Sequence, residues 1–271
     1  AEALEAADQY EEALLSLDRA AAEGAPRIPV ALLRASVLRH QGHLEAMLPV
    51  VDAALEGVKG VEAARLLVQR ARGLIGLARY LEGQEAARAA LAACPEEERR
   101  VRADALFEMA NSLWQRGEPV SALEVLNQTL ALREAAEDRR GVSEAIIALG
   151  TVLGGQGRCD RAVELLRLGL ALNQKIGDRR AAALCKLNIA HALSDLGDLQ
   201  AAQDEIERAG DAASRIGNPR LLAWSELVAG VILAKRGKSR DAVNRLERVA
   251  GEARKVGDLR MLAGALAESV A

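Results

Sequence analysis

Four glycines recur at a constant spacing of 40 residues through the second half of the chain: Gly117, Gly157, Gly197 and Gly237. Alanine stands five residues after each of them, and leucine stands four residues before. The position seven residues before each glycine is always alanine or glycine. A fixed period of this length indicates a repeat architecture, in which each repeat is one supersecondary unit that stacks on its neighbours.

Each repeat has the pattern of two helices separated by the turn glycine. Apolar residues recur with helical spacing before the glycine, as in Leu184, Leu187 and Leu193. Asp178 and Asn218 stand where the first helix of a repeat begins, and such side chains cap free backbone N–H groups. A single helix pair cannot bury its apolar faces, whereas stacked pairs can. The sequence therefore predicts an all-α fold, a right-handed solenoid of antiparallel helix pairs.

Composition excludes several other classes of protein. Aromatic residues make up only 2% of the 271 residues, which disfavours a β-sandwich or barrel. The three cysteines include no CxxC pair, so they predict no disulfide framework and favour a reducing, cytoplasmic setting. The sequence contains no long uncharged apolar run of the kind that predicts a membrane-spanning helix. A net charge of -3 gives no general attraction to nucleic acid.

Toward the N-terminus the repeat continues with less regular spacing. Asp8–Ala13 matches a turn followed by an inner alanine, and Gly42 marks the next turn. Leu81-Glu82-Gly83 marks the third turn, although Gly73 and Gly76 compete for it. We expect a single solenoid over 1–271, with approximate units 1–26, 27–59, 60–96, 97–137, 138–177, 178–217 and 218–257 and a last helix over 258–271. Solenoids finish with a polar capping helix, so this apolar end favours a fragment of a longer chain.

These columns of residues resemble the tetratricopeptide repeat (TPR) family in its 40-residue variety. Gly150, Gly157, Ala162 and Leu166 match the small residue, turn glycine, inner alanine and following apolar residue of the family pattern. The family's usual aromatic residues are almost absent, and Leu153 stands where tyrosine is common. The spacing is similar to repeat arrays in bacterial multidomain regulators, including signalling ATPases, protein kinases and transcriptional activators. The resemblance implies that partners bind the concave surface formed by the first helix of each repeat.

Positions that contact a partner should vary between repeats, whereas positions that build the stack should recur. The columns that begin at Asn111, Trp114 and Gln115 vary in this way. Arginine and aromatic residues are favoured anchors at interfaces, so we expect a groove that is basic in its N-terminal units and holds an acidic, extended or helical peptide. The alternative is that Trp114 packs between helices and the arginines are solvated. The candidate partner-binding residues are Arg39, Arg72, Arg79, Tyr80, Phe107, Asn111, Trp114, Gln115, Thr151, His191 and Lys235.

No motif indicates catalysis, a cofactor or a metal site. Gly230 and Gly237 are too far apart for a phosphate-binding loop, and His40 and His43 lack an obvious third ligand. We therefore predict a protein- or peptide-binding scaffold or regulatory module, not an enzyme, which binds neither nucleic acid nor membrane. One alternative is a sensory domain that binds a small effector or signalling peptide and controls an attached ATPase, kinase or transcription-factor output domain. Another is a self-association segment that forms a homo-oligomer by stacking its ends.

Overall fold

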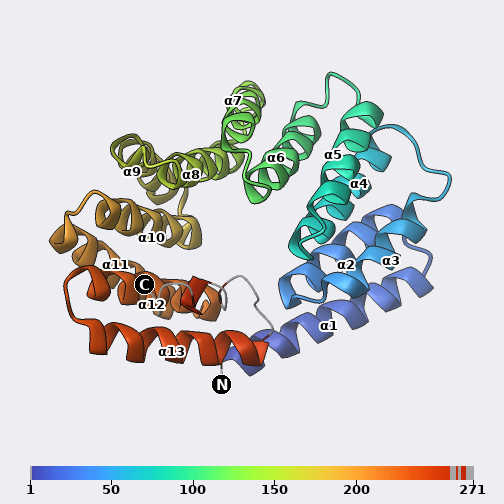
Figure 1. The fold of residues 1–271 in the computed structure, drawn as a ribbon. Coiled ribbons are helices and arrows are strands. Elements are labelled where there is room, and N and C mark those ends of the chain that lie inside the picture. Colours follow the sequence, from blue (N-terminus) through green and yellow to red (C-terminus); the bar gives the residue numbers. More distant parts are fainter. Residues whose placement is uncertain (1, 257–260, 262–263, 267–271) are drawn as a thin grey trace. The chain divides into compact units, whose positions relative to one another are not determined.

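The computed structural model describes the backbone of residues 2–256, 261 and 264–266, and side chains from residue 9 to 254 and at 261 and 264–266. This part of the chain is built from helices and contains no strand (Figure 1). The helices are α1 (Glu2–Ala22), α2 (Arg27–Gln41), α3 (Leu44–Leu55), α4 (Gly60–Gly76), α5 (Tyr80–Ala93), α6 (Arg99–Gln115), α7 (Pro119–Ala135), α8 (Arg139–Gly155), α9 (Cys159–Ile176), α10 (Arg179–Asp195), α11 (Leu199–Arg215), α12 (Pro219–Lys235) and α13 (Ser239–Val256).

The chain divides into two compact units, and the boundary lies inside α8 between Ala145 and Ile146. Unit 1 ends at Ala145 and unit 2 begins at Ile146. Within unit 1, α2 packs on α3, α4 on α5 and α6 on α7; within unit 2, α10 packs on α11 and α12 on α13. The repeat therefore predicted the all-α stack of helix pairs correctly.

We call the first helix of each pair the A helix and the second the B helix. The A helices are α2, α4, α6, α8, α10 and α12. In unit 1, α2 also contacts α4 and α4 contacts α6, and in unit 2 α10 contacts α12. Neighbouring A helices thus lie against one another and form a common face in each unit. A side chain on this face can reach side chains of the adjacent repeats.

The recurring residues of the sequence perform the structural roles that their spacing predicts. The turn glycines have positive φ, for example 77° at Gly117 and 76° at Gly157. A left-handed residue of this kind ends a helix, and only glycine adopts it without strain. Asp178 accepts a hydrogen bond from the backbone N–H of Ala181 at 2.9 Å, so it caps α10 as expected.

Two of the N-terminal turns lie elsewhere than predicted. The third turn follows α4, and Gly83 lies inside α5, so the prediction of a turn at Leu81-Glu82-Gly83 is wrong. Gly83 instead occupies the inner position, where an added Cβ would lie 2.6 Å from Cγ1 of Ile75. The turn predicted at Asp8 is also wrong, since α1 runs unbroken from Glu2 to Ala22 without a glycine or proline to end it. The last helix expected over 258–271 lies largely outside the described residues.

Ala78 and Glu137 stand at turn positions that hold glycine in other repeats, and they have positive φ values of 60° and 51°. Non-glycine residues in this conformation cost about 1–3 kcal/mol, which exceeds the extra unfolded-state entropy of glycine, about 0.5–1 kcal/mol. We expect Ala78→Gly and Glu137→Gly each to raise the free energy of unfolding by about 1 kcal/mol in urea titrations. The reverse change, Gly157→Ala, should lower it, and a loss of stability in Ala78→Gly would contradict this account.

Candidate functional site

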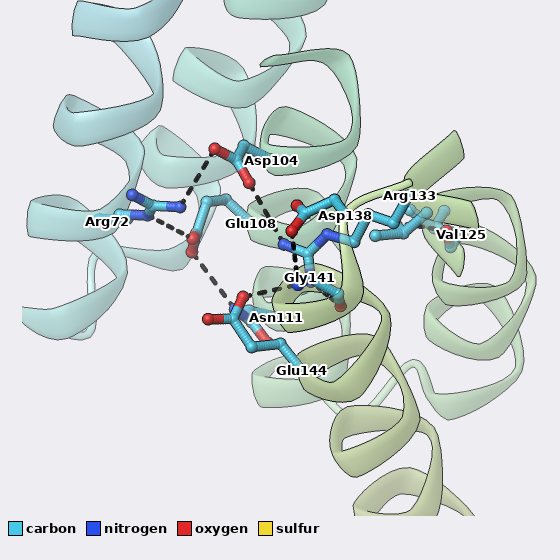
Figure 2. Close-up of polar contacts among 10 residues, drawn as sticks. Arg72, Asp104, Glu108, Asn111, Val125, Arg133, Asp138, Gly141 and Glu144 are labelled. Atoms are coloured by element: carbon cyan, nitrogen blue, oxygen red, sulfur yellow. Dashed lines mark hydrogen bonds and ion pairs between the residues drawn. The ribbon is translucent and has the colours of Figure 1, made fainter. Parts of the chain in front are cut away.

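Five charged side chains from four helices meet on the A-helix side of unit 1. They are Arg72 of α4, Asp104 and Glu108 of α6, Arg133 of α7 and Glu144 of α8. Figure 2 shows their side chains converging, with the two arginines on opposite sides of Asp104. We call these five residues the charged cluster.

Arg133 enters the cluster from a B helix and is the most buried of its members, with 1% of its side chain exposed. Its Nη2 lies 3.2 Å from Oδ1 of Asp104, and its Nη1 lies 3.2 Å from Oε2 of Glu144. Nη1 also donates a hydrogen bond of 2.6 Å to the backbone oxygen of Gly141. The guanidinium carbon lies 4.6 Å from the centre of the Phe107 ring. These contacts compensate a charge that burial alone would strongly disfavour.

Gly141 lies near the start of α8, and because it has no side chain it leaves space for the side chain of Arg133. An added Cβ at Gly141 would collide with Oδ2 of Asp138 and would lie 2.7 Å from Cδ of Arg133. The equivalent pairs one and two repeats later are Asn173 with Ala181 and Ala213 with Leu221. The B-helix residue becomes smaller as the A-helix residue becomes larger, which predicts that the two positions compensate each other in size at the boundaries between repeats. Arg133 is the largest B-helix member of this series.

Arg72 is held by the carboxylates of α6. Its Nε donates to Oε1 of Glu108 at 2.8 Å, and its Nη2 lies 3.7 Å from Oδ2 of Asp104. Burial opposes the charge of Arg72, but Glu108 and Asp104 outweigh burial and raise the pKa of the guanidinium. Asn111, one turn after Glu108, donates from Nδ2 to Oε2 of the same carboxylate at 3.3 Å. Arg72 and Asn111 are thus joined through Glu108 (Figure 2).

Acids partly neutralise two of the arginines for which the sequence predicts a basic groove, and the part of these arginines in binding stays a prediction. The side chain of Arg72 is 23% exposed and its guanidinium contacts two carboxylates, and Arg79 pairs with Glu82 at 2.5 Å. The charged cluster as a whole contains two guanidinium groups and three carboxylates. Sequence inspection missed this balance because the acids that neutralise Arg72 lie 32 and 36 positions further along the chain.

The remaining predicted residues of unit 1 lie on or beside the A helices. Phe107 packs against Arg133 as described, and Trp114 and Gln115 are half-buried near the end of α6. Tyr80, the first residue of α5, is half-buried, and its backbone oxygen accepts a hydrogen bond from Oγ of Ser112 at 2.7 Å. Arg39 is half-buried in α2. Their part in binding stays a prediction.

In unit 2 the predicted residues Thr151, His191 and Lys235 are exposed on three successive A helices. Asn188 donates to Oγ1 of Thr151 at 3.1 Å and so joins α10 to α8. Asp195 joins the other two residues, since it lies 2.6 Å from Nζ of Lys235 and 3.6 Å from Nδ1 of His191. These links fix the positions of the three side chains, and their part in binding likewise stays a prediction.

Four members of the charged cluster were absent from the predicted set: Asp104, Glu108, Arg133 and Glu144. One sequence signal could have found Arg133. Its column continues as Asn173, Ala213 and Ala253, so a large charged residue stands where later repeats have small ones. The acids give no such signal, because surface helices carry many acidic residues.

All three cysteines are buried and unpaired. Burial raises the pKa of the Cys185 thiol to about 11, despite a contact of 3.6 Å from Nδ2 of Asn173. The nucleophilic form of cysteine is the thiolate, so Cys185 is unreactive near neutral pH.

The raised pKa of Cys185 predicts a loss of stability in alkaline solution. In the unfolded chain a thiol ionises near its ordinary pKa of about 8.5. The folded protein keeps this proton until about pH 11, so it binds more protons than the unfolded chain in between, and stability falls as pH rises. We expect Cys185→Ala to show a shallower decline of the free energy of unfolding over this range. Equal slopes for parent and variant would refute the assignment.

The described residues show neither a metal site nor a membrane-spanning helix. No group of three or more His, Cys, Asp or Glu side chains lies close enough there to hold a metal ion. None of the helices in that part of the chain combines the length and the apolar character needed to cross a membrane.

The comparison with protein families decides the identity of the central repeats. The model of the tetratricopeptide repeat family matches residues 101–175. This range contains the whole of α7 and α8 and most of α6 and α9. Residues 101–175 are tetratricopeptide repeats. This TPR segment includes four of the five residues of the charged cluster, and the fifth, Arg72, lies in the preceding repeat. A search of curated proteins with the sequence finds no match.

Solved structures extend the TPR fold over nearly the whole chain. The apo form of RapI is similar with a TM-score of 0.66 at 15% identity, over 90% of this chain and 97% of RapI. A Rap protein complexed with Competence and Sporulation Factor gives a TM-score of 0.69 at 15% identity, over 97% of this chain and 85% of that one. The third is a Signal Transduction ATPase with Numerous Domains (STAND) protein with a TPR sensor from Pyrococcus horikoshii. Its TM-score is 0.65 at 12% identity, over 88% of this chain and 37% of that one.

Proposed function

We propose that this chain is a regulatory binding scaffold that holds a segment of a partner protein on its A-helix face. The observation that carries the proposal is the charged cluster, in which side chains from four helices are fixed on that face by mutual ion pairs. Asn111 extends the cluster along α6, with Trp114 one turn beyond it. A polar group that is already positioned binds with little loss of conformational entropy, which favours recognition.

A capture experiment tests the scaffold proposal. The chain is immobilised and exposed to a lysate beside an Asn111→Ala/Trp114→Ala variant whose folding is verified by circular dichroism. The control is Glu164→Ala, since Glu164 is exposed on α9 of the other unit. We expect a protein that the parent and the control retain and the double variant loses. Equal capture by all three proteins would exclude this face as the binding site.

A second candidate function is a sensory module that controls an attached output domain. It is favoured by the likeness to the TPR sensor of the STAND protein and to the Rap protein complexed with Competence and Sporulation Factor. In this case a ligand would change the arrangement of the repeats, because successive helix pairs contact only their neighbours. Small-angle scattering with and without the captured partner separates the two candidates, since a passive scaffold keeps its dimensions.

A further inference from the structure

The charged cluster has both arginines and one carboxylate, Glu108, on its inner side, and its other two carboxylates on its outer side. Arg133 is 1% exposed and Arg72 is 23% exposed, whereas Asp104 is 39% and Glu144 is 58% exposed. A ligand that approaches the A-helix face therefore meets carboxylate oxygens first. The guanidinium groups lie behind them and are already bonded, so they offer little to an anion.

The charges within the cluster do not balance. Asp104 is shared by Arg72 and Arg133, Glu108 bonds Arg72, and Glu144 bonds Arg133. With two guanidinium groups against three carboxylates, one negative charge is left over when all five groups are ionised. A carboxylate can accept about four hydrogen bonds, so the outer pair, Asp104 and Glu144, retains the capacity for a further cationic donor.

The pKa of Glu144 also indicates that its negative charge is not fully compensated. Partial burial raises the pKa of its carboxylate, as do the nearby Asp104 and Asp138, although Arg133 and Arg72 act in the opposite direction. The two arginines therefore compensate the negative charge of Glu144 only in part. A third cation next to Glu144 would complete the compensation.

We infer that the charged cluster receives a lysine or arginine side chain from an extended segment of a partner protein, bonded to Asp104 and Glu144. This inference rests on the proposed scaffold function and names the chemistry of its ligand. It replaces the acidic peptide that the sequence suggested. The partner cation is selected by charge, and the buried arginines hold the two receiving carboxylates in place. Such charge-assisted hydrogen bonds are short and strong compared with neutral ones.

Selection from a library of random peptides tests the inference with a defined probe. Peptides are selected on the immobilised chain, and the most enriched sequences are synthesised with a fluorophore for affinity measurements. Their dissociation constants are compared for the parent, for Glu144→Gln/Asp104→Asn and for a control, Glu164→Gln/Asp160→Asn on α9. All four substitutions conserve side-chain size, and both acids of the control are exposed. Glu144→Gln alone is included, since Glu144 is the most exposed member of the cluster and its replacement should leave the fold intact.

We expect the selected peptides to be rich in lysine or arginine and to bind the Glu144→Gln/Asp104→Asn variant about tenfold more weakly, with no change in the control. Acidic or uncharged peptides, or basic peptides that bind this variant and the parent equally, would overturn the inference. In those cases the scaffold proposal survives if the same peptides lose affinity for Asn111→Ala/Trp114→Ala. If binding depends on neither set of residues, or no peptide is selected, both proposals fail.

Discussion

Gly141→Leu is expected to destabilise unit 1 by about 3–5 kcal/mol, one of the two largest effects that the structure predicts. The leucine side chain would meet Oδ2 of Asp138 and would occupy the space of Arg133, whose Cδ lies 2.7 Å from the position of an added Cβ. It would also displace the guanidinium from the backbone oxygen of Gly141, to which Arg133 donates at 2.6 Å. Overpacking and the loss of compensation for a buried charge then act together. Urea titration followed by circular dichroism measures the change.

A second substitution distinguishes this mechanism from a general intolerance of α8. Arg133→Ala in the Gly141→Leu background recreates the pair that Ala213 and Leu221 form two repeats later. We expect the double variant to recover much of the lost stability, so the two effects should be strongly non-additive. Additive losses of the free energy of unfolding would show that the sizes of residues 133 and 141 contribute to stability independently of each other. Gly154→Ala controls for glycine replacement in the same helix, because its added Cβ would have an ordinary contact of 3.8 Å.

The second large effect is expected at Leu166, which anchors α9 against α8 in unit 2. Leu166 is 1% exposed, and its side chain lies directly over Gly150, where an added Cβ would be 2.6 Å from Cγ of the leucine. Leu166→Ala removes buried methyl groups and leaves a cavity, which costs about 2–5 kcal/mol. Thermal or urea unfolding of the variant measures the loss.

Gly150→Ala provides the matched test of this contact. Alone it should destabilise, because the new methyl group collides with Leu166. In the Leu166→Ala background the same methyl group enters the vacated space and should restore part of the stability. If Gly150→Ala is equally harmful in both backgrounds, the close approach of α8 and α9 is not what Leu166 stabilises.

The charged cluster joins the A-helix face to the interior of unit 1. Arg133 belongs to a B helix, packs on Phe107 and reaches through the stack to the two outer carboxylates. A ligand cation bound at Asp104 and Glu144 would therefore share these two carboxylates with Arg133. Binding at this face is expected to be coupled to the packing at the boundary between α7 and α8.

The repeat predicted the local structure well because each of its signals acts over a few residues. Gly157 ends an A helix through its own positive φ, and Asp178 caps α10 through a bond to a backbone group three residues away. Neither depends on what lies elsewhere in the fold. The prediction failed at the third turn, where Ala78 adopts the glycine conformation and Gly83 serves as a small packing residue. There the neighbouring helices override the local preference.

The sequence by itself determined the helix pairs, most of their turns and caps, and the resemblance to the TPR family. It also placed Arg72 and Asn111 among the candidate binding residues. Only the tertiary structure decided what surrounds them, because the ion pairs that join Arg72 to Glu108 and Arg133 to Asp104 span 36 and 29 residues. The sign of charge that a partner meets depends on which end of each ion pair is exposed. That is a property of packing, since burial places the guanidinium groups inside and leaves the carboxylates of Asp104 and Glu144 at the surface.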